Sequence, residues 1–209
     1  SVHFGFQIAD KPIGRVCTTL QWTLNHPTPG AENTVAETGP STGVRINEWS
    51  GNNDFIVDED FVELFNAGAL PVDLSGAVLT DDPINFPQQN IIAPLSYINA
   101  GGFVLFRADG NTGAGSNHVS FQISRLREGI SLTNAGTVID HIMSVPLLDD
   151  VTGGRATDGG GVFALFGTGA GYPNLPTPGY SNTTSLAAQQ LLMDNLRITE
   201  IMYNPQGNS

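Results

Sequence analysis

The chain has 209 residues, with 20 acidic and 8 basic side chains, and its formal net charge is −12. Lys11 is its single lysine, which excludes a polybasic patch and argues against non-specific nucleic-acid binding. No apolar run approaches the ~18 residues of a membrane-spanning helix. We therefore expect a globular acidic protein that neither binds nucleic acid nor inserts into a membrane.

Short runs of β-branched and aromatic residues, separated by Gly, Pro, Asn and Asp, predict strands along most of the chain. Seven or more such strands favour an all-β sandwich over other architectures. The expected strands are 44–49, 61–66, 103–107, 119–124, 130–133, 137–142 and 162–166.

Two of these segments and one connection between them allow more specific predictions. The alternation in 119–124 places Val119, Phe121 and Ile123 on one face, with polar residues on the other. The run at 103–106 is apolar on both sides, which is typical of a central strand covered on both faces. Asn134-Ala-Gly between two apolar runs predicts a tight hairpin.

One segment favours a helix. Residues 184–193 are good helix formers behind a Ser or Thr suited to an N-cap. Ten residues are marginal for an isolated helix, so this one needs packing to persist.

Two motifs recur at a spacing of roughly 150 residues, the size of a domain. Pro-Thr-Pro-Gly at 27–30 returns at 176–179, and Val-Arg-Ile-Asn-Glu-Trp at 44–49 returns as Leu-Arg-Ile-Thr-Glu-Ile at 196–201. Gly-Arg at 14–15 is repeated at 154–155. We interpret the chain as follows: 1–33 the end of a preceding repeat, 34–43 a linker, 44–182 a complete domain, 183–195 a second and possibly helical linker, and 196–209 the first strand of a following repeat.

The partial repeats allow more than one arrangement. A piece of 33 residues cannot bury a core of its own, so it packs on the central domain, joins the C-terminal piece or binds a neighbouring molecule. Head-to-tail self-association is therefore one hypothesis. Alternatively, the whole chain is one compact unit in which the matching segments pair as edge strands.

Motifs in the central region resemble the lamin tail domain family, in its secreted bacterial, tandem form. They follow the order of that family through nearly all of 44–182, and the main ones are Ile-Asn-Glu at 46–48, Asp-Phe-Val-Glu-Leu-Phe-Asn at 60–66, 72–82, Leu-Thr-Asn-Ala-Gly-Thr-Val-Ile-Asp at 132–140, and Pro-Thr-Pro-Gly at 176–179. The chain departs from the family at Phe61, where a Trp is common, and at Ala77, where an aromatic residue is common.

The resemblance implies an immunoglobulin-like β-sandwich and an accessory role in a larger secreted or surface bacterial protein. It implies an extracellular location and no catalytic activity of its own. DNA contacts made by animal members transfer poorly to a chain of charge −12. The expected function is a structural or interaction module that presents loops at the ends of a rigid sandwich, with no cofactor and with partners that the sequence does not identify.

Two glutamates stand inside apolar strands. A close pair of carboxylates at Glu48 and Glu63 would suit acid–base or glycosidic chemistry. Buried strand carboxylates more often accept hydrogen bonds from backbone N–H groups or pair with an arginine, here Arg45 or Arg155. We therefore expect these two residues to be structural.

A run of acids precedes the second predicted strand and offers hard oxygen ligands. Asp54, Asp58 and Asp60 are the candidates for a Ca²⁺ site, although the spacing matches no EF-hand loop. The alternative function is accordingly a carbohydrate-binding or Ca²⁺-dependent adhesion module accessory to an exoenzyme. Trp22 and Trp49 would supply a sugar platform if exposed, and core packing if buried. A hydrolase would require polar residues that converge in a pocket.

Overall fold

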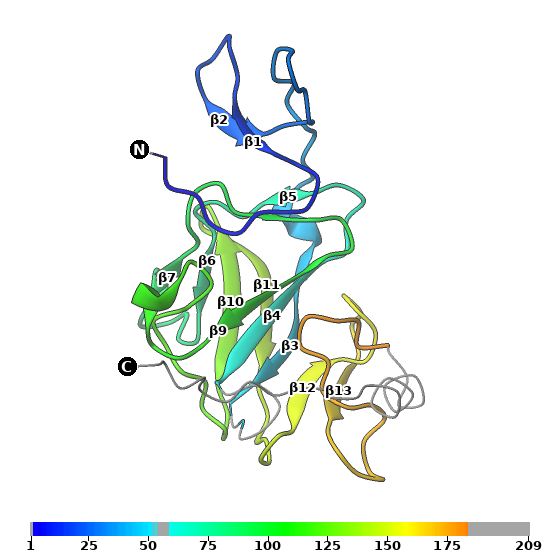
Figure 1. Ribbon diagram of the computed structural model, residues 1–209. Coiled ribbons are helices and arrows are strands. Elements are labelled where there is room, and N and C mark those ends of the chain that lie inside the picture. The colour runs from blue at the N-terminus through cyan, green and yellow to red at the C-terminus, as the bar shows by residue number, and fades with distance from the viewer. Residues whose placement is uncertain (1, 52, 54–58, 184–209) are drawn as a thin grey trace, which may run out of the picture.

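The computed structural model describes residues 2–51, 53 and 59–183, and its regular structure is almost entirely β (Figure 1). Two antiparallel sheets form the body. The five-stranded sheet runs in the order β13 (Phe163–Phe166), β12 (Thr152–Arg155), β3 (Val44–Ser50), β4 (Phe61–Asn66) and β9 (Phe103–Arg107). The four-stranded sheet runs in the order β11 (Thr137–Met143), β10 (Gly129–Asn134), β6 (Val78–Thr80) and β7 (Asn90–Ile91).

Smaller elements complete the fold. β5 (Val72–Asp73) pairs with β8 (Tyr97–Ile98), and β1 (Ile13–Arg15) pairs with β2 (Trp22–Leu24). Single 3₁₀ turns lie at η1 (Ser41–Gly43) and η2 (Thr112–Ala114). The predicted all-β sandwich is confirmed.

The core lies between the two sheets and is built by alternation along the strands. Ile46 of β3 and Leu64 of β4 face Leu79 of β6 and Leu132 of β10, and all four side chains are fully buried. Phe106 closes the side near β9, where the ring of Phe6 packs edge-on against it with ring centroids 5.4 Å apart. Burial of apolar side chains of this size supplies most of the driving force for the fold.

Most predicted strands are found within a residue or two of their expected ends. The hairpin at Asn134-Ala-Gly is also confirmed, since β10 and β11 join there and both central residues have positive φ, 47° at Ala135 and 78° at Gly136. Such a turn matches the twist of the strands that it joins. The predicted helix at 184–193 lies outside the described residues.

Residues 119–124 have the predicted faces but do not form a strand. Val119, Phe121 and Ile123 are buried, and Ser120, Gln122 and Ser124 are exposed. The backbone is extended without a ladder, and its one bridge joins His118 to Arg107. Side-chain alternation reports which face is buried, whereas strand assignment requires a hydrogen-bonded neighbour.

The strand expected at the centre of a sheet lies at an edge. β9 is the outermost strand of the five-stranded sheet, and Phe103, Val104 and Leu105 are only partly buried. Its apolar outer face is covered by neighbouring side chains rather than by a further layer, as in the pair of Phe103 with Phe65, with ring centroids 4.9 Å apart.

The N-terminal residues contact the sandwich at one end. Gly5 donates to the carbonyl of Pro94 at 2.9 Å, and Tyr97 donates to the carbonyl of Phe6 at 3.1 Å. Leu24 of β2 and Tyr97 of β8 share a small apolar cluster with Ala36. The β1–β2 hairpin extends beyond this end of the body (Figure 1).

The core position of Leu64 yields a first prediction. Leu64→Ala removes a fully buried side chain and is expected to lower the free energy of unfolding by about 2–5 kcal/mol, because lost burial and a cavity add together. Ile84→Ala, at a side chain that is 88% exposed, should change it by less than ~0.5 kcal/mol. Urea unfolding followed by tryptophan fluorescence measures both. Equal losses in the two variants would contradict the assignment of this core.

Candidate functional site

A β-bulge in β3 creates the polar centre of the molecule. The register with β4 shifts between Ile46 and Glu48, so Asn47 is the additional residue and Glu48 stands opposite Glu63. The bulge reverses the alternation, so Ile46 and Trp49 both face the core and Glu48 faces outward with Glu63. The two carboxylates thus share the outer face of the sheet, and both side chains are fully buried.

A chain segment far away in sequence covers the two glutamates. Glu48 accepts hydrogen bonds from the backbone N–H of Thr177 at 3.1 Å, from the Thr177 hydroxyl at 2.9 Å and from the Thr152 hydroxyl at 2.5 Å. Glu63 accepts from the backbone N–H of Gly179 at 2.5 Å and from the amide of Asn47 at 3.0 Å. We call residues 176–182 the closing segment.

Asp158 is the third acid of the group. It accepts from the backbone N–H of Asn182 at 2.9 Å, from the Asn47 amide at 3.1 Å and from the Ser181 hydroxyl. Glu48, Glu63 and Asp158 together form what we call the carboxylate cluster. The donors to these three carboxylates are side-chain and backbone groups of the same chain.

Arg155 and Arg45 bind groups other than the two glutamates. Arg155 pairs with Asp140 at 2.7 Å, and the two bracket Ile46, whose carbonyl accepts from Arg155 at 2.8 Å and whose N–H donates to Asp140 at 2.8 Å. Arg45 donates to the carbonyl of Thr42 at 2.7 Å. Of the two structural roles left open by the sequence, hydrogen bonds from backbone N–H groups are the one observed, and pairing with Arg45 or Arg155 is not.

Gly154 permits the close approach of the closing segment. A Cβ at this position would lie 2.6 Å from the Phe166 ring, 3.0 Å from the Asn47 carbonyl and 3.1 Å from the Asn182 amide. That amide donates to the carbonyl of Arg155 at 2.8 Å, which fixes Asn182 beside β12.

Burial controls the charge of the cluster. It raises the pKa of Glu63 to about 8, with repulsion from Glu48 and Asp158 in the same direction and bonds from Asn47 and Gly179 opposing it. Burial also raises the pKa of Glu48, against bonds from Thr152 and Thr177. The Thr177 hydroxyl lies 2.9 Å from both Glu48 and Asn182 and so links these two side chains.

The cluster is therefore arranged to join chain segments. Its two glutamates lie side by side, as the acid–base hypothesis requires, but both are fully buried and their oxygens accept internal hydrogen bonds. Asp158, Thr177 and Asn182 were not predicted as members. The available signal was the repeated Pro-Thr-Pro-Gly motif, which contains Thr177 and Gly179.

Of the predicted calcium ligands, only Asp60 is described, because Asp54 and Asp58 lie outside the described residues. Asp60 accepts a hydrogen bond from the backbone N–H of Ile123 at 3.2 Å. Among the described residues, no salt bridge joins Asp60 to a basic side chain. Burial raises its pKa to about 6. Asp60 therefore has a local role in holding the 119–124 segment.

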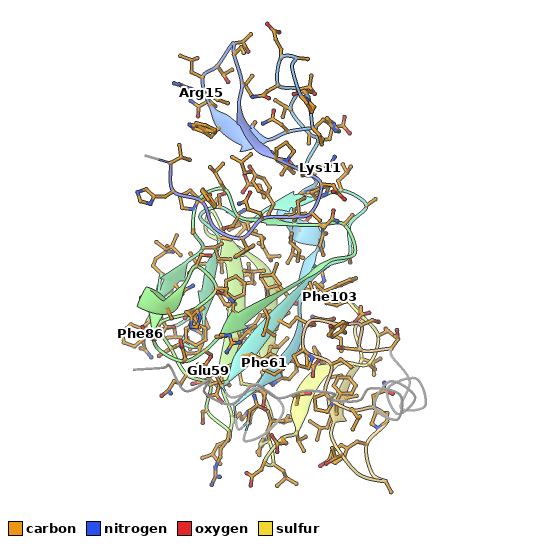
Figure 2. The ribbon with its side chains drawn as sticks, viewed as in Figure 1. Lys11, Arg15, Glu59, Phe61, Phe86 and Phe103 are labelled. Carbon is orange, nitrogen blue, oxygen red and sulfur yellow. The ribbon has the colours of Figure 1, made fainter. Side chains whose placement is uncertain are left out.

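A different acidic group lies beside it, at the end of β4 where Figure 2 labels Glu59 and Phe61. Ligand atoms of Glu59, Asp109 and His118 lie within 4.8 Å of one another, a geometry that suits a metal ion. The same side chains already have partners, since Glu59 pairs with Arg107 at 2.8 Å and His118 with Asp109 at 2.7 Å. A cation bound here would compete with these two pairs.

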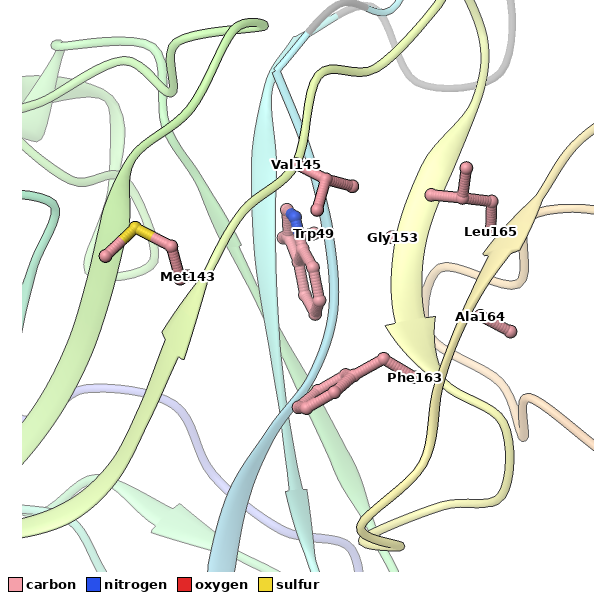
Figure 3. Close-up of a pocket in the computed structure, with 7 residues that line it drawn as sticks. All are labelled: Trp49, Met143, Val145, Gly153, Phe163, Ala164 and Leu165. Carbon is pink, nitrogen blue, oxygen red and sulfur yellow. The ribbon is translucent and has the colours of Figure 1, made fainter.

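An open apolar hollow of about 360 Å³ lies between β11, β3 and the β12–β13 hairpin (Figure 3). Its lining residues carry no titratable group: Trp49, Met143, Val145, Gly153, Phe163, Ala164 and Leu165. Trp49 is buried and packs edge-on against Phe163, so it offers no flat platform for a sugar. Its indole Nε1 has no hydrogen-bond partner. Trp22 is 43% exposed, at the distant β1–β2 hairpin.

The raised pKa of Glu63 predicts a pH dependence of stability. The folded state binds this proton up to about pH 8 and the unfolded chain only up to about 4.5, so the free energy of unfolding falls as the pH rises through that window. Glu63→Gln should reduce this decline, although it loses stability at pH 5 because two donors then compete for one acceptor. Urea titrations at pH 5, 6.5 and 8 measure the slope.

Glu37→Gln is the matched control, because Glu37 is exposed, and it should follow the wild-type slope. A Glu63→Gln variant with the full wild-type decline would show that Glu63 ionises normally.

The hydroxyl of Thr177 yields a further prediction. Thr177→Val keeps the shape but removes the bonds to Glu48 and Asn182, and it should cost about 2–4 kcal/mol, since buried acceptors lose their donor. Thr177→Ser keeps the hydroxyl and should cost less than half as much. Thermal and urea unfolding of the pair separate the hydroxyl from the methyl group. Equal losses would assign the effect to packing.

Comparisons with known proteins return nothing for this chain. No family model matches it, and neither a curated protein nor a solved structure shows significant similarity. Within the part of the chain that the structure describes, we find no helix with the length and apolar character needed to cross a membrane.

Proposed function

We propose that the chain is a non-catalytic structural and interaction module, an immunoglobulin-like sandwich of the lamin-tail type in a larger secreted or surface-exposed bacterial protein. The observation that carries this proposal is the carboxylate cluster. Its acids accept hydrogen bonds from the backbone of the closing segment and hold that segment on β3 and β4. This use of the acids favours a structural role for the cluster.

The position of the cluster in the chain supports a role in holding the two ends of the domain together. Glu48 lies in the first strand of the body and Thr177 in the closing segment, so the hydrogen bonds between them tie the beginning of the proposed domain to its end. A domain closed in this way resists separation of its ends better than one with a free terminal segment, because several buried bonds must break together.

Exposed loops provide the proposed contact surfaces. The 81–90 loop combines Asp, Asn and Gln with the exposed side chains of Ile84 and Phe86, and the 109–117 loop is rich in Gly and Asn. Both connect strands at the margins of the sandwich. A rigid sheet that positions variable loops is a common way to present a binding surface. The net charge of −12 favours solubility.

The second candidate is a Ca²⁺-dependent or carbohydrate-binding adhesion module. The group of Glu59, Asp109 and His118 favours it, and the ion pair of Glu59 with Arg107 opposes it. Asp60, whose side chain accepts from the backbone N–H of Ile123, adds a third carboxylate next to Glu59 in the sequence.

A ligand titration separates the two candidates. Under the structural proposal, the melting temperature stays within 1 °C in 5 mM CaCl₂ and in 5 mM EDTA, roughly the size of a negligible change in stability, and a glycan array shows no saturable binding. Under the adhesion alternative, Ca²⁺ raises the melting temperature by several degrees through preferential binding to the folded state.

Asp109→Asn supplies the control for that titration, because Ca²⁺ is bound by oxygen ligands and this variant weakens a carboxylate ligand. If Ca²⁺ binds at Glu59, Asp109 and His118, this variant loses the stabilisation, whereas a response that survives it comes from another site. Saturable stabilisation by Ca²⁺ or binding to a defined glycan would overturn the purely structural proposal.

A further inference from the structure

The β1–β2 hairpin and the loop that follows it reproduce the β12–β13 hairpin and the closing segment. Arg15 pairs with Trp22 in the first hairpin, as Arg155 pairs with Phe163 in the second. Gly14 and Gly154 each precede the arginine, and both are buried. The sequence repeat is therefore a repeat of three-dimensional structure.

The two Pro-Thr-Pro-Gly loops also share their hydrogen bonds. Thr28 donates to Asn33 at 3.2 Å, as Thr177 donates to Asn182 at 2.9 Å. The Asn33 amide donates to the Arg15 carbonyl at 3.0 Å, and the Asn182 amide donates to the Arg155 carbonyl at 2.8 Å. The glycines that end the motifs have similar φ angles, 76° and 84°.

One component is missing from the first of these units. β12 pairs with β13 on one side and with β3 on the other, where Gly154 stands opposite Glu48. β1 pairs with β2, and no other strand of the described residues pairs with β1. Thr177 and Asn182 are buried under the sheet, whereas Thr28 is partly exposed and Asn33 is exposed.

A buried acceptor in the residue that follows β2 also lacks a donor. Asn25 is fully buried, and its amide nitrogen donates to the carbonyls of Gly14 and Thr23, which fixes the orientation of the amide. Its Oδ1 atom has no hydrogen-bond partner. Buried polar atoms are rarely left without one, so this position calls for a donor that the described residues do not supply.

The chain contains a sequence suited to the empty edge. Residues 196–201 repeat the sequence of β3, and Glu200 occupies the position of Glu48. Because β1–β2 and β12–β13 lie at opposite ends of the body (Figure 1), and the described chain ends at Thr183 near the latter, a second molecule is the better source of this strand.

We propose that residues 196–201 of one copy pair antiparallel with the free edge of β1 in a second copy, and that the Glu200 carboxylate accepts hydrogen bonds from Thr28. Each molecule then offers one acceptor and one donor, so the contact is heterologous and extends head to tail. The inference deepens the proposed structural role by naming the partner as a second copy of this chain. Its test is independent of the calcium and glycan measurements.

Sedimentation velocity of the 209-residue chain between 1 and 200 μM tests the association. We expect the mass to rise with concentration in steps of one monomer. A synthetic peptide of residues 195–209, added in excess, should return the chain to monomer and bind it saturably. The same peptide with Glu200→Gln should bind about tenfold more weakly, because it loses charge-assisted hydrogen bonds.

Variants at both ends test the proposed hydrogen bond between Thr28 and Glu200. Thr28→Val should weaken peptide binding by a similar factor, and Thr28→Ser, which keeps the hydroxyl, should bind nearly as the wild type does. Glu200→Gln in the full chain leaves the hairpin unchanged and should still reduce assembly. The proposal would be overturned if the chain stays monomeric at 200 μM. It would also be overturned if neither Thr28→Val nor Glu200→Gln changes the association.

Discussion

The structure depends on the burial of two glutamates that face each other across β3 and β4. Two ionised carboxylates in an apolar setting repel each other and lose hydration, so Glu48 and Glu63 are tolerated only with internal donors and raised pKa values. The donors come largely from Thr177 and Gly179, more than 100 residues away in the chain. Release of the closing segment would leave buried acceptors unpaired, and this couples the end of the domain to its first strand.

Much of the fold follows from local sequence. Short runs of β-branched and aromatic residues predicted β4 and β9 with their observed ends, and Asn134-Ala-Gly predicted the hairpin that joins β10 and β11. The position of a strand within a sheet is not a local property. β9 is an edge strand and 119–124 has no ladder because both outcomes depend on which distant segments lie alongside.

The site was predictable in part. The placement of Glu48 and Glu63 in neighbouring strands followed from the pattern, but their direct opposition follows from the bulge at Asn47, which alternation alone does not reveal. Asp158 and Asn182 reach the cluster through loops whose paths depend on Gly154 and on the hairpin beside it. The calcium hypothesis drew on the density of acids, whereas the described Asp60 is held by the backbone of Ile123.

A polar joint suits a chain of similar repeats better than an apolar one. An apolar residue in place of Glu48 would bury comparable area against any neighbouring strand, in any register. A carboxylate is satisfied only where a threonine hydroxyl and free backbone N–H groups meet it, so a shifted strand leaves the acid unpaired. Both the Glu-containing motif and Pro-Thr-Pro-Gly recur in the chain after roughly 150 residues. In the described domain, one motif supplies the acceptor and the other the donors, and the buried bonds between them fix the register of the closing segment against β3 and β4.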